Sequence, residues 1–224
     1  VTPRTGCAVE INALWYNAIK FALEAAQKAK DKDFIEQWQT RADAFPHEFI
    51  NAFWDPEKGY LADYIDQNGA NWDIRPNMVL AASLPYSPVE ESIQREVLHI
   101  AHNHLVTSRG LRSLSPRNHQ YKGEYKGNER QRNLAYHQGT VWPWLLGHFA
   151  QGFLKINGKQ GLPLIKKLYH GFEDEMINHG IGTISEVYSG NPPHEGGGNI
   201  SQAWNIAELL RIRDLINNFE NNTE

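Results

Sequence analysis

The chain contains the stretch YHQGTVWPWLLGHF, which begins at Tyr136 and ends at Phe149. Apolar residues at helical spacing fill its second half, so it predicts a helix over about residues 140–156. Thr140 can cap this helix, and Pro143 suits the first turn, where a missing N–H costs nothing. The stretch therefore predicts a turn that leads directly into a helix.

The same stretch crowds aromatic and polar side chains onto one helix entrance. His137 and Gln138 come just before the helix, and Gly139 lets the backbone turn tightly. Trp142 and Trp144 are expected to point to different sides, so that only one of them lines a pocket. Both indoles could equally be core residues, because large aromatic side chains are mostly buried.

Helical spacing recurs along most of the chain. In the first segment it is carried by Ile11, Leu14, Trp15, Ala18, Phe21, Ala22 and Ala25, which indicate an amphipathic helix. Seven helices are predicted, over about residues 9–30, 31–53, 73–85, 87–105, 140–156, 160–178 and 202–218. Pro46 is expected to kink or interrupt the second helix. Residues 110–133 and 180–198 lack periodicity and form long polar or glycine-rich loops.

This pattern predicts an all-α fold with about seven helices. In helical hairpins arranged in a ring, one end carries the short turns and the other carries long loops that can converge on a pocket. An open bundle or a solenoid is the alternative, but the sequence shows no internal repeat that would support an array.

Composition excludes several classes of function. The 224 residues carry a net charge of -4 with no block of like charges, so we expect no nucleic-acid partner. No apolar run reaches the length of a membrane span. The single cysteine, Cys7, excludes an internal disulfide. His102 and His104 would diverge on a helix, so neither a metal nor another cofactor is expected. Because the chain starts at Val1 without Met, we expect a fragment of a longer protein.

The loops carry the side chains that a sugar site needs. Sugars present apolar C–H faces and rims of hydroxyls, which suit aromatic platforms flanked by forked hydrogen-bonding groups. Four clusters of such residues lie in or beside the loops, at residues 72–77, 112–125, 136–138 and 186–194. Together they indicate a carbohydrate site at the loop end of the helices.

Glycoside hydrolysis also requires two carboxyl groups across the scissile bond. Glu186 is the first candidate, because the β-branched residues before it would hold it stiffly. Glu10, at a helix start where a carboxylate is favoured anyway, and Asp73 are the rivals. Residue chemistry alone leaves the three open.

Several motifs together resemble a known family. They are Thr2-Pro3-Arg4, the segment 9–18 (VEINALWYNA), Ile74-Arg75-Pro76-Asn77, the segment 110–116 (GLRSLSP), the segment 135–144 (AYHQGTVWPW) and Gly182-Thr183-Ile184-Ser185-Glu186. In this order they resemble the C-terminal amylo-α-1,6-glucosidase domain of bacterial and archaeal glycogen debranching enzymes. The resemblance extends over nearly the whole chain.

The resemblance implies an (α/α)6 toroid similar to glucoamylase, and hydrolysis of α-1,6-linked glucose at branch points with inversion. It implies that Glu186 is the general base and that the general acid is an Asp upstream of residue 2, in a stretch that this chain lacks. We therefore expect a single domain, residues 1–224, that is the C-terminal portion of a larger toroid and is inactive alone. The implied substrate-binding residues are Glu10, Trp15, Asp73, Arg75, Asn77, Tyr136, His137, Gln138 and Trp144.

Two other functions stay open at this point. One is another (α/α)6 glycosidase, such as a trehalase or a processing α-glucosidase. The other is a helical domain that binds glucan without hydrolysing it. The expected partner is a branched α-glucan such as glycogen or limit dextrin, in the cytoplasm and without a membrane, and the exposed helix faces of a truncated ring would allow a dimer.

Overall fold

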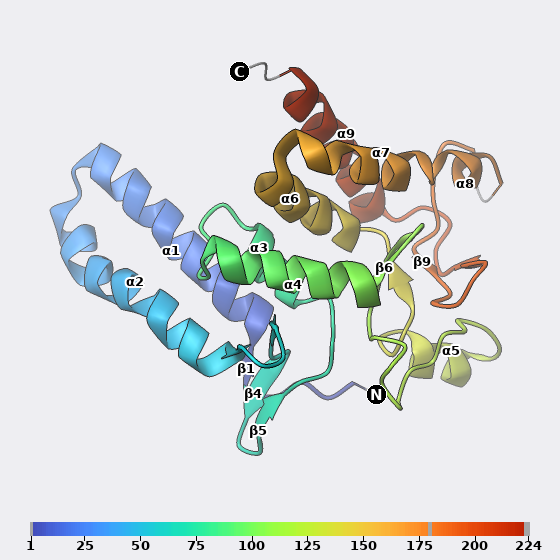
Figure 1. Ribbon diagram of the computed structural model, residues 1–224, viewed down its shortest axis with the longest axis horizontal. Helices are drawn as coiled ribbons and strands as arrows, with labels where there is room; N and C mark the ends of the chain where they lie inside the picture. The colour runs from blue at the N-terminus through green and yellow to red at the C-terminus, as the bar shows by residue number, and fades with distance from the viewer. Residues whose placement is uncertain (1, 179–180, 222–224) are drawn as a thin grey trace.

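The computed structural model describes residues 2–178 and 181–221, and most of this part of the chain is helical (Figure 1). Its α-helices are α1 (Val9–Ala29), α2 (Lys32–Phe53), α3 (Met78–Ser83), α4 (Glu91–His104), α5 (Glu129–Ala135), α6 (Leu145–Asn157), α7 (Leu162–His170), α8 (Glu173–Asn178) and α9 (Ala203–Asn221). A 3-10 turn, η1 (Gly158–Gly161), links α6 to α7. Each of the seven predicted helices has a counterpart here.

The helices form an arc of hairpins. Along its inner side α1 packs on α3, α3 on α6, and α6 on α9. On the outer side α2 packs on α1, α4 lies against α3 and α6, and α7 lies against α9. Figure 1 shows α1 and α2 at one end of this arc, with α6, α7 and α9 at the other. Inner and outer helices thus alternate along the chain, as paired helices of a ring do.

The helices differ from the predictions in three ways. Residues 160–178 form two helices, α7 and α8, because the chain turns at Gly171 and Phe172. The segment predicted as an irregular loop contains α5, which begins with a capping box. The Asn128 side chain accepts from the Gln131 backbone N–H at 3.0 Å, and the Gln131 side chain accepts from the Asn128 backbone N–H at 2.9 Å. Pro46 lies within α2 and does not interrupt it.

The entrance of α6 also differs. Thr140 does not cap this helix, which begins only at Leu145. Its hydroxyl instead donates to the Ala135 carbonyl at 2.8 Å, and residues 141–142 form a strand. The prediction failed because the strand pairing of this turn competes with early helix formation.

Short antiparallel strands connect the loops. One sheet joins β1 (Cys7–Ala8), β4 (Tyr64–Asp66) and β5 (Gly69–Asn71), and another joins β2 (Trp54–Asp55) to β3 (Tyr60–Leu61). The third has the order β10 (Gly196–Gly197), β9 (Val187–Tyr188), β8 (Val141–Trp142), β7 (Gly110–Arg112), β6 (Val106–Thr107). In it Trp142 lies opposite Leu111, and Val141 lies opposite Tyr188. The third sheet therefore brings both long loops to the entrance of α6.

One face of α1 is apolar and exposed. Ile11 and Phe21 are 61% and 65% exposed, and Leu14, Trp15 and Ala18 are also exposed along the same stripe. The inward face is formed instead by Val9, Ala13, Tyr16, Leu23 and Ala26. The apolar periodicity of this segment predicted a helix correctly, but most of the residues that carried it lie on the side that faces away from the described core.

Two further absences concern the described residues. None of their helices has the length and hydropathy that crossing a membrane would require. No three His, Cys, Asp or Glu side chains in residues 2–178 and 181–221 are grouped as metal ligands would be.

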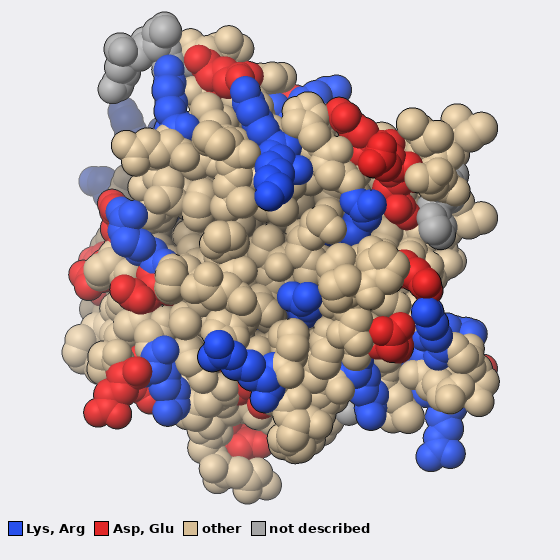
Figure 2. All heavy atoms as spheres, turned by 45° about the vertical axis from the view of Figure 1, so that its right-hand side comes forward, with Lys and Arg blue, Asp and Glu red and all other residues tan. Residues whose placement is uncertain are grey.

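Figure 2 shows acidic and basic side chains interspersed over one face, with broad uncharged surface between them.

Candidate active site

A cavity of about 320 Å³ opens among the loops that precede the inner helices. This volume lies near the lower end of the range for small-molecule sites. Its walls come from the N-terminal segment, the turn before α3, the loop after β7, the entrance of α6 and the start of α9. The lining residues are Thr2, Arg4, Arg75, Pro76, Asn77, Ser113, His137, Trp142, Trp144, Leu145 and Trp204.

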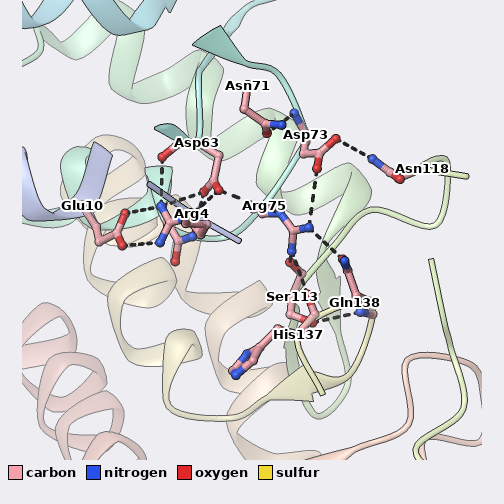
Figure 3. Close-up of polar contacts among 12 residues, drawn as sticks. Arg4, Glu10, Asp63, Asn71, Asp73, Arg75, Ser113, Asn118, His137 and Gln138 are labelled. Carbon is pink, nitrogen blue, oxygen red and sulfur yellow. Dashed lines mark hydrogen bonds and ion pairs between the residues drawn. The ribbon is translucent and has the colours of Figure 1, made fainter. Parts of the chain in front are cut away.

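Arg75 holds two of these walls together. It is only 5% exposed, and it donates to the carbonyls of Ser113 (3.1 Å) and His137 (2.7 Å) and to Gln138 Oε1 (2.7 Å). Asp73 Oδ2 lies 3.5 Å from the same guanidinium (Figure 3). A planar fork with several donors suits this task better than a lysine ammonium would. Arg75 and Gln138 therefore shape the cavity through their contacts with the chain itself.

Asp73 is held from its other side as well. Its Oδ1 accepts from Asn118 Nδ2 at 2.6 Å, and its backbone N–H donates to Asn71 Oδ1 at 3.1 Å. Asp73 does not line the cavity. The structure thus places it behind Arg75, as a partner of that side chain.

A buried carboxylate that sequence reasoning missed, Asp63, lies behind the lining residues Arg4, Arg75 and Asn77. It accepts from Arg4 Nε at 2.7 Å, with Arg75 Nε 3.9 Å away (Figure 3). It also accepts from Asn77 Nδ2 at 2.7 Å. Burial raises its pKa, while Arg4, Asn77 and Arg75 oppose that rise. Asp63 fixes the orientation of three cavity-lining side chains.

Arg4 was also missed, although it belongs to a motif quoted from the sequence. Besides Asp63 it contacts Glu10, through two hydrogen bonds of 2.6 and 2.7 Å. This bidentate geometry is the strong form of an arginine–carboxylate pair. Glu10 therefore lies beside the cavity as the partner of Arg4, and it is not a lining residue itself.

Three indoles form one side of the cavity, which we call the tryptophan wall: Trp142, Trp144 and Trp204. The rings of Trp144 and Trp204 stack with centroids 5.3 Å apart, and Trp142 meets Trp204 edge-on at 6.0 Å. The expectation that only one of Trp142 and Trp144 lines a pocket was wrong, because the β8 strand and the turn after it replace helical spacing. His137 lies parallel to the Trp142 ring at 5.5 Å.

Glu186 lies next to this wall, behind Tyr136. Its side chain is buried, and Oε1 accepts a hydrogen bond from the Tyr136 hydroxyl while Oε2 accepts from the Asn199 N–H at 2.8 Å. The Tyr136 ring in turn packs edge-on against Trp142, with centroids 4.7 Å apart. Burial, followed by the contact with Glu186, raises the pKa of the Tyr136 hydroxyl. Neither Glu186 nor Tyr136 is among the lining residues, so the carboxylate does not face the cavity as it stands.

Trp15 lies elsewhere. Its indole packs against Trp38 (6.2 Å) and Phe45 (5.3 Å) of α2, and it does not line the cavity. Of the predicted substrate-binding residues, the cavity lining includes Arg75, Asn77, His137 and Trp144. Four others do not line the cavity but contact residues that do: Tyr136, Gln138, Asp73 and Glu10. Of the predicted set, Trp15 alone lies on a different surface.

Residues 1–211 match the protein-family model described as amylo-alpha-1,6-glucosidase. The chain belongs to this family. The family is one of glycoside hydrolases, so the cavity and its carboxylates lie in a glycosidase-type protein.

One curated relative and three solved structures are similar to this chain. The glycogen debranching enzyme of Saccharomyces cerevisiae is 27% identical over 187 residues, which cover 68% of this chain and 12% of that protein. Among solved structures, neutral trehalase from Saccharomyces cerevisiae superposes with a TM-score of 0.66 at 15% identity, covering 95% of this chain and 40% of that one. An uncharacterized conserved protein from Thermus thermophilus gives 0.64 at 19% identity, with 92% and 46% covered. A mannosylglycerate hydrolase from the same organism, solved with Tris, gives 0.63 at 18% identity, with 92% and 44% covered.

These likenesses show the fold. The amylo-alpha-1,6-glucosidase family chain is all-α and forms part of an (α/α)6 toroid, with its long loops on one rim. It spans about an eighth of the debranching enzyme's length and less than half of each of the three solved chains.

Proposed function

We propose that the cavity binds a terminal glucosyl unit of a branched α-glucan such as glycogen or limit dextrin. In this proposal the protein that contains the chain hydrolyses the α-1,6 bond at the branch point with inversion, in the cytoplasm. The observation that carries it is the buried Glu186 carboxylate, held by Tyr136 directly behind a cavity that has aromatic rings on one side and hydrogen-bonding groups on the other.

The charges around the cavity favour a neutral ligand. The guanidinium of Arg4 is paired with Glu10 and Asp63, and that of Arg75 lies near Asp73 and Asp63. Both positive charges are therefore compensated by carboxylates of the chain. An anionic ligand would find no unmatched cation among these groups, whereas a sugar needs only hydrogen bonds and an apolar face.

In the proposed reaction Glu186 is the general base. It takes a proton from a water molecule, whose oxygen forms a bond to the anomeric carbon as the bond to the leaving oxygen breaks. An acid protonates the leaving oxygen, and in inverting enzymes the two carboxyl groups lie about 6.5–9.5 Å apart. Tyr136 must release or share Glu186 for water to reach it. We propose that the general acid is supplied by a segment outside these 224 residues, so that the chain alone is inactive.

We also propose that the chain is the C-terminal portion of a larger toroid, whose other helices pack on the exposed stripe of α1. The stripe lies on α1, the first inner helix of the arc, where a further inner helix of a ring would pack. The similar solved chains are also more than twice as long as this chain. Without that cover, two copies should associate through the stripe. Sedimentation of the wild type and of Phe21→Glu measures this: a wild type as monomeric as the variant would argue against an unpartnered face.

The base is tested in the enzyme that contains the chain. Glu186→Gln should fold normally and abolish glucose release from limit dextrin, while Glu195→Gln, an exposed carboxylate of the same loop, should leave turnover unchanged. Near wild-type turnover in Glu186→Gln would refute the assignment. Turnover of trehalose instead of branched glucan would indicate a different glycosidase, and binding without any turnover in the wild type would indicate a glucan-binding domain.

A further inference from the structure

The tryptophan wall runs from the inside of the cavity to its mouth. Trp142 is 6% exposed, Trp144 is half-buried, and Trp204 is 45% exposed. Trp204 lines the cavity and yet presents nearly half of its surface to solvent. A sugar ring inside the cavity would contact the inner part of the wall, and Trp204 is left facing whatever lies beyond that ring.

Trp204 is fixed relative to Glu186 by the residue that follows it. Asn205 is fully buried, and its Nδ2 donates to the carbonyls of Ser185 (3.0 Å) and Glu186 (2.8 Å). Its Oδ1 accepts from the backbone N–H of Trp144 at 3.2 Å. One side chain thus ties the backbone of Ser185 and Glu186 to that of Trp144 and to the start of α9, which fixes the Trp204 backbone. Stacking on Trp144 orients the Trp204 ring.

The cavity has room for about one sugar ring. At about 320 Å³ it is close to the smallest sites that hold drug-sized ligands. A second ring joined to the first must therefore lie at the mouth. Aromatic rings attract apolar faces there because the contact removes both from water.

We propose that Trp204 is a specificity-determining residue that stacks against the second sugar ring of the substrate, on the leaving-group side of the scissile bond. The site then selects an α-linked oligosaccharide over a glucoside with a small leaving group. This inference rests on the proposed glucosyl site. It adds a residue that no sequence motif singled out.

The test compares two ligands by calorimetry or ligand-observed NMR on the enzyme that contains the chain, with Glu186→Gln in all variants so that neither ligand is hydrolysed. Methyl α-D-glucopyranoside occupies the cavity only, and isomaltose adds a second ring through an α-1,6 bond. In Trp204→Ala the affinity for isomaltose should fall roughly three- to tenfold, the size of an aromatic contact, while that for the methyl glucoside changes less than twofold. Trp204→Phe, which keeps an aromatic face, should recover most of the loss.

Leu210→Ala is the matched control, because Leu210 lies on the same helix, is 47% exposed and does not line the cavity. It should leave both affinities unchanged. If Trp204→Ala lowers the affinity for both ligands equally, or changes neither affinity, the inference is overturned. The proposal of the glucosyl site is unaffected by either result. If the Glu186→Gln enzyme with Trp204 intact binds neither ligand, the glucosyl site is refuted, and the role of Trp204 with it.

Discussion

The Tyr136 hydroxyl donates a hydrogen bond to Glu186 Oε1 across 50 positions of sequence. The turn before β8 and the second long loop are thereby joined into one polar unit beside the cavity. Because the carboxylate is buried, its bonds to Tyr136 and to Asn199 matter for folding as well as for any chemistry.

Tyr136→Phe should therefore destabilise the chain. The change removes one donor and leaves a buried carboxylate oxygen without it, which costs about 1–3 kcal/mol. Urea unfolding measures the free energy of unfolding of variant and wild type. Tyr169→Phe serves as the control, since the hydroxyl of Tyr169 makes no hydrogen bond within residues 2–178 and 181–221. Equal stabilities of the two variants would show that the Tyr136 bond contributes nothing.

Gly198 leaves room for Glu186. A Cβ at Gly198 would lie 2.6 Å from Glu186 Oε2, so Gly198→Ala must displace the carboxylate or the loop. The backbone of Gly198 has a φ of +74°, and Gly182 shares that value with nothing within 4 Å of its Cβ position. Both alanine variants should lose about 1–2 kcal/mol to backbone strain, and Gly198→Ala about 1–3 kcal/mol more from overpacking.

Thermal or urea unfolding of these two variants separates the contributions. The difference between them isolates the contact with Glu186, because the strain cancels. If Gly198→Ala and Gly182→Ala were equally stable, the carboxylate could move aside at no cost, and the close packing described for it would have no energetic role.

Arg75→Lys should be costly although it keeps the charge. An ammonium cannot reach the Ser113 and His137 carbonyls and Gln138 Oε1 together, so at least one buried acceptor loses its donor. The expected loss is about 2–4 kcal/mol. Arg117→Lys, at an exposed position, should change stability by less than about 0.5 kcal/mol. A small effect of both changes would contradict the bridging role of Arg75.

His148 should make stability depend on pH. Burial, with a smaller effect of Arg211, lowers its pKa from 6.5 to about 4. Between these values the unfolded chain binds a proton that the folded chain does not, so the free energy of unfolding rises with pH across this window. Acidification from pH 7 to pH 4 should therefore remove about 3 kcal/mol through this group.

Other acidic groups also titrate, so the comparison is with His148→Gln. Urea unfolding at pH 7 and at pH 4 should show a smaller loss of stability in the variant, by that same amount. Parallel pH profiles of wild type and variant would mean that His148 is not held neutral by the fold.

Sequence periodicity located the helices because apolar spacing is a local property. It did not reveal which face of α1 is buried, since Ile11 and Phe21 satisfy the helical pattern and yet lie on the exposed stripe. Tertiary contacts decide that face, and no local pattern contains them. The start of α5 was different: Asn128 and Gln131 carry a capping-box signal that the sequence offered and that the loop prediction overlooked.

Some residues of the candidate site could likewise be predicted from the sequence, and others could not. Motifs drew attention to Arg75, His137 and Glu186, whose environments are now described. Asp63 escaped notice because its partner Arg4 is 59 residues away, and the two meet only through the pairing of β1 with β4, in which Ala8 lies opposite Tyr64. Register between distant strands sets that contact, and single-sequence reasoning has no access to it.

Asn205 has a consequence for anyone who would redesign this protein. Since a single amide anchors the backbones of both Glu186 and Trp144, a change at Asn205 would alter substrate preference and the position of the carboxylate together. Changes around Asn77 meet a different shared anchor, Asp63, which holds Arg4, Asn77 and Arg75 and does not bind Glu186 among the contacts of the described residues.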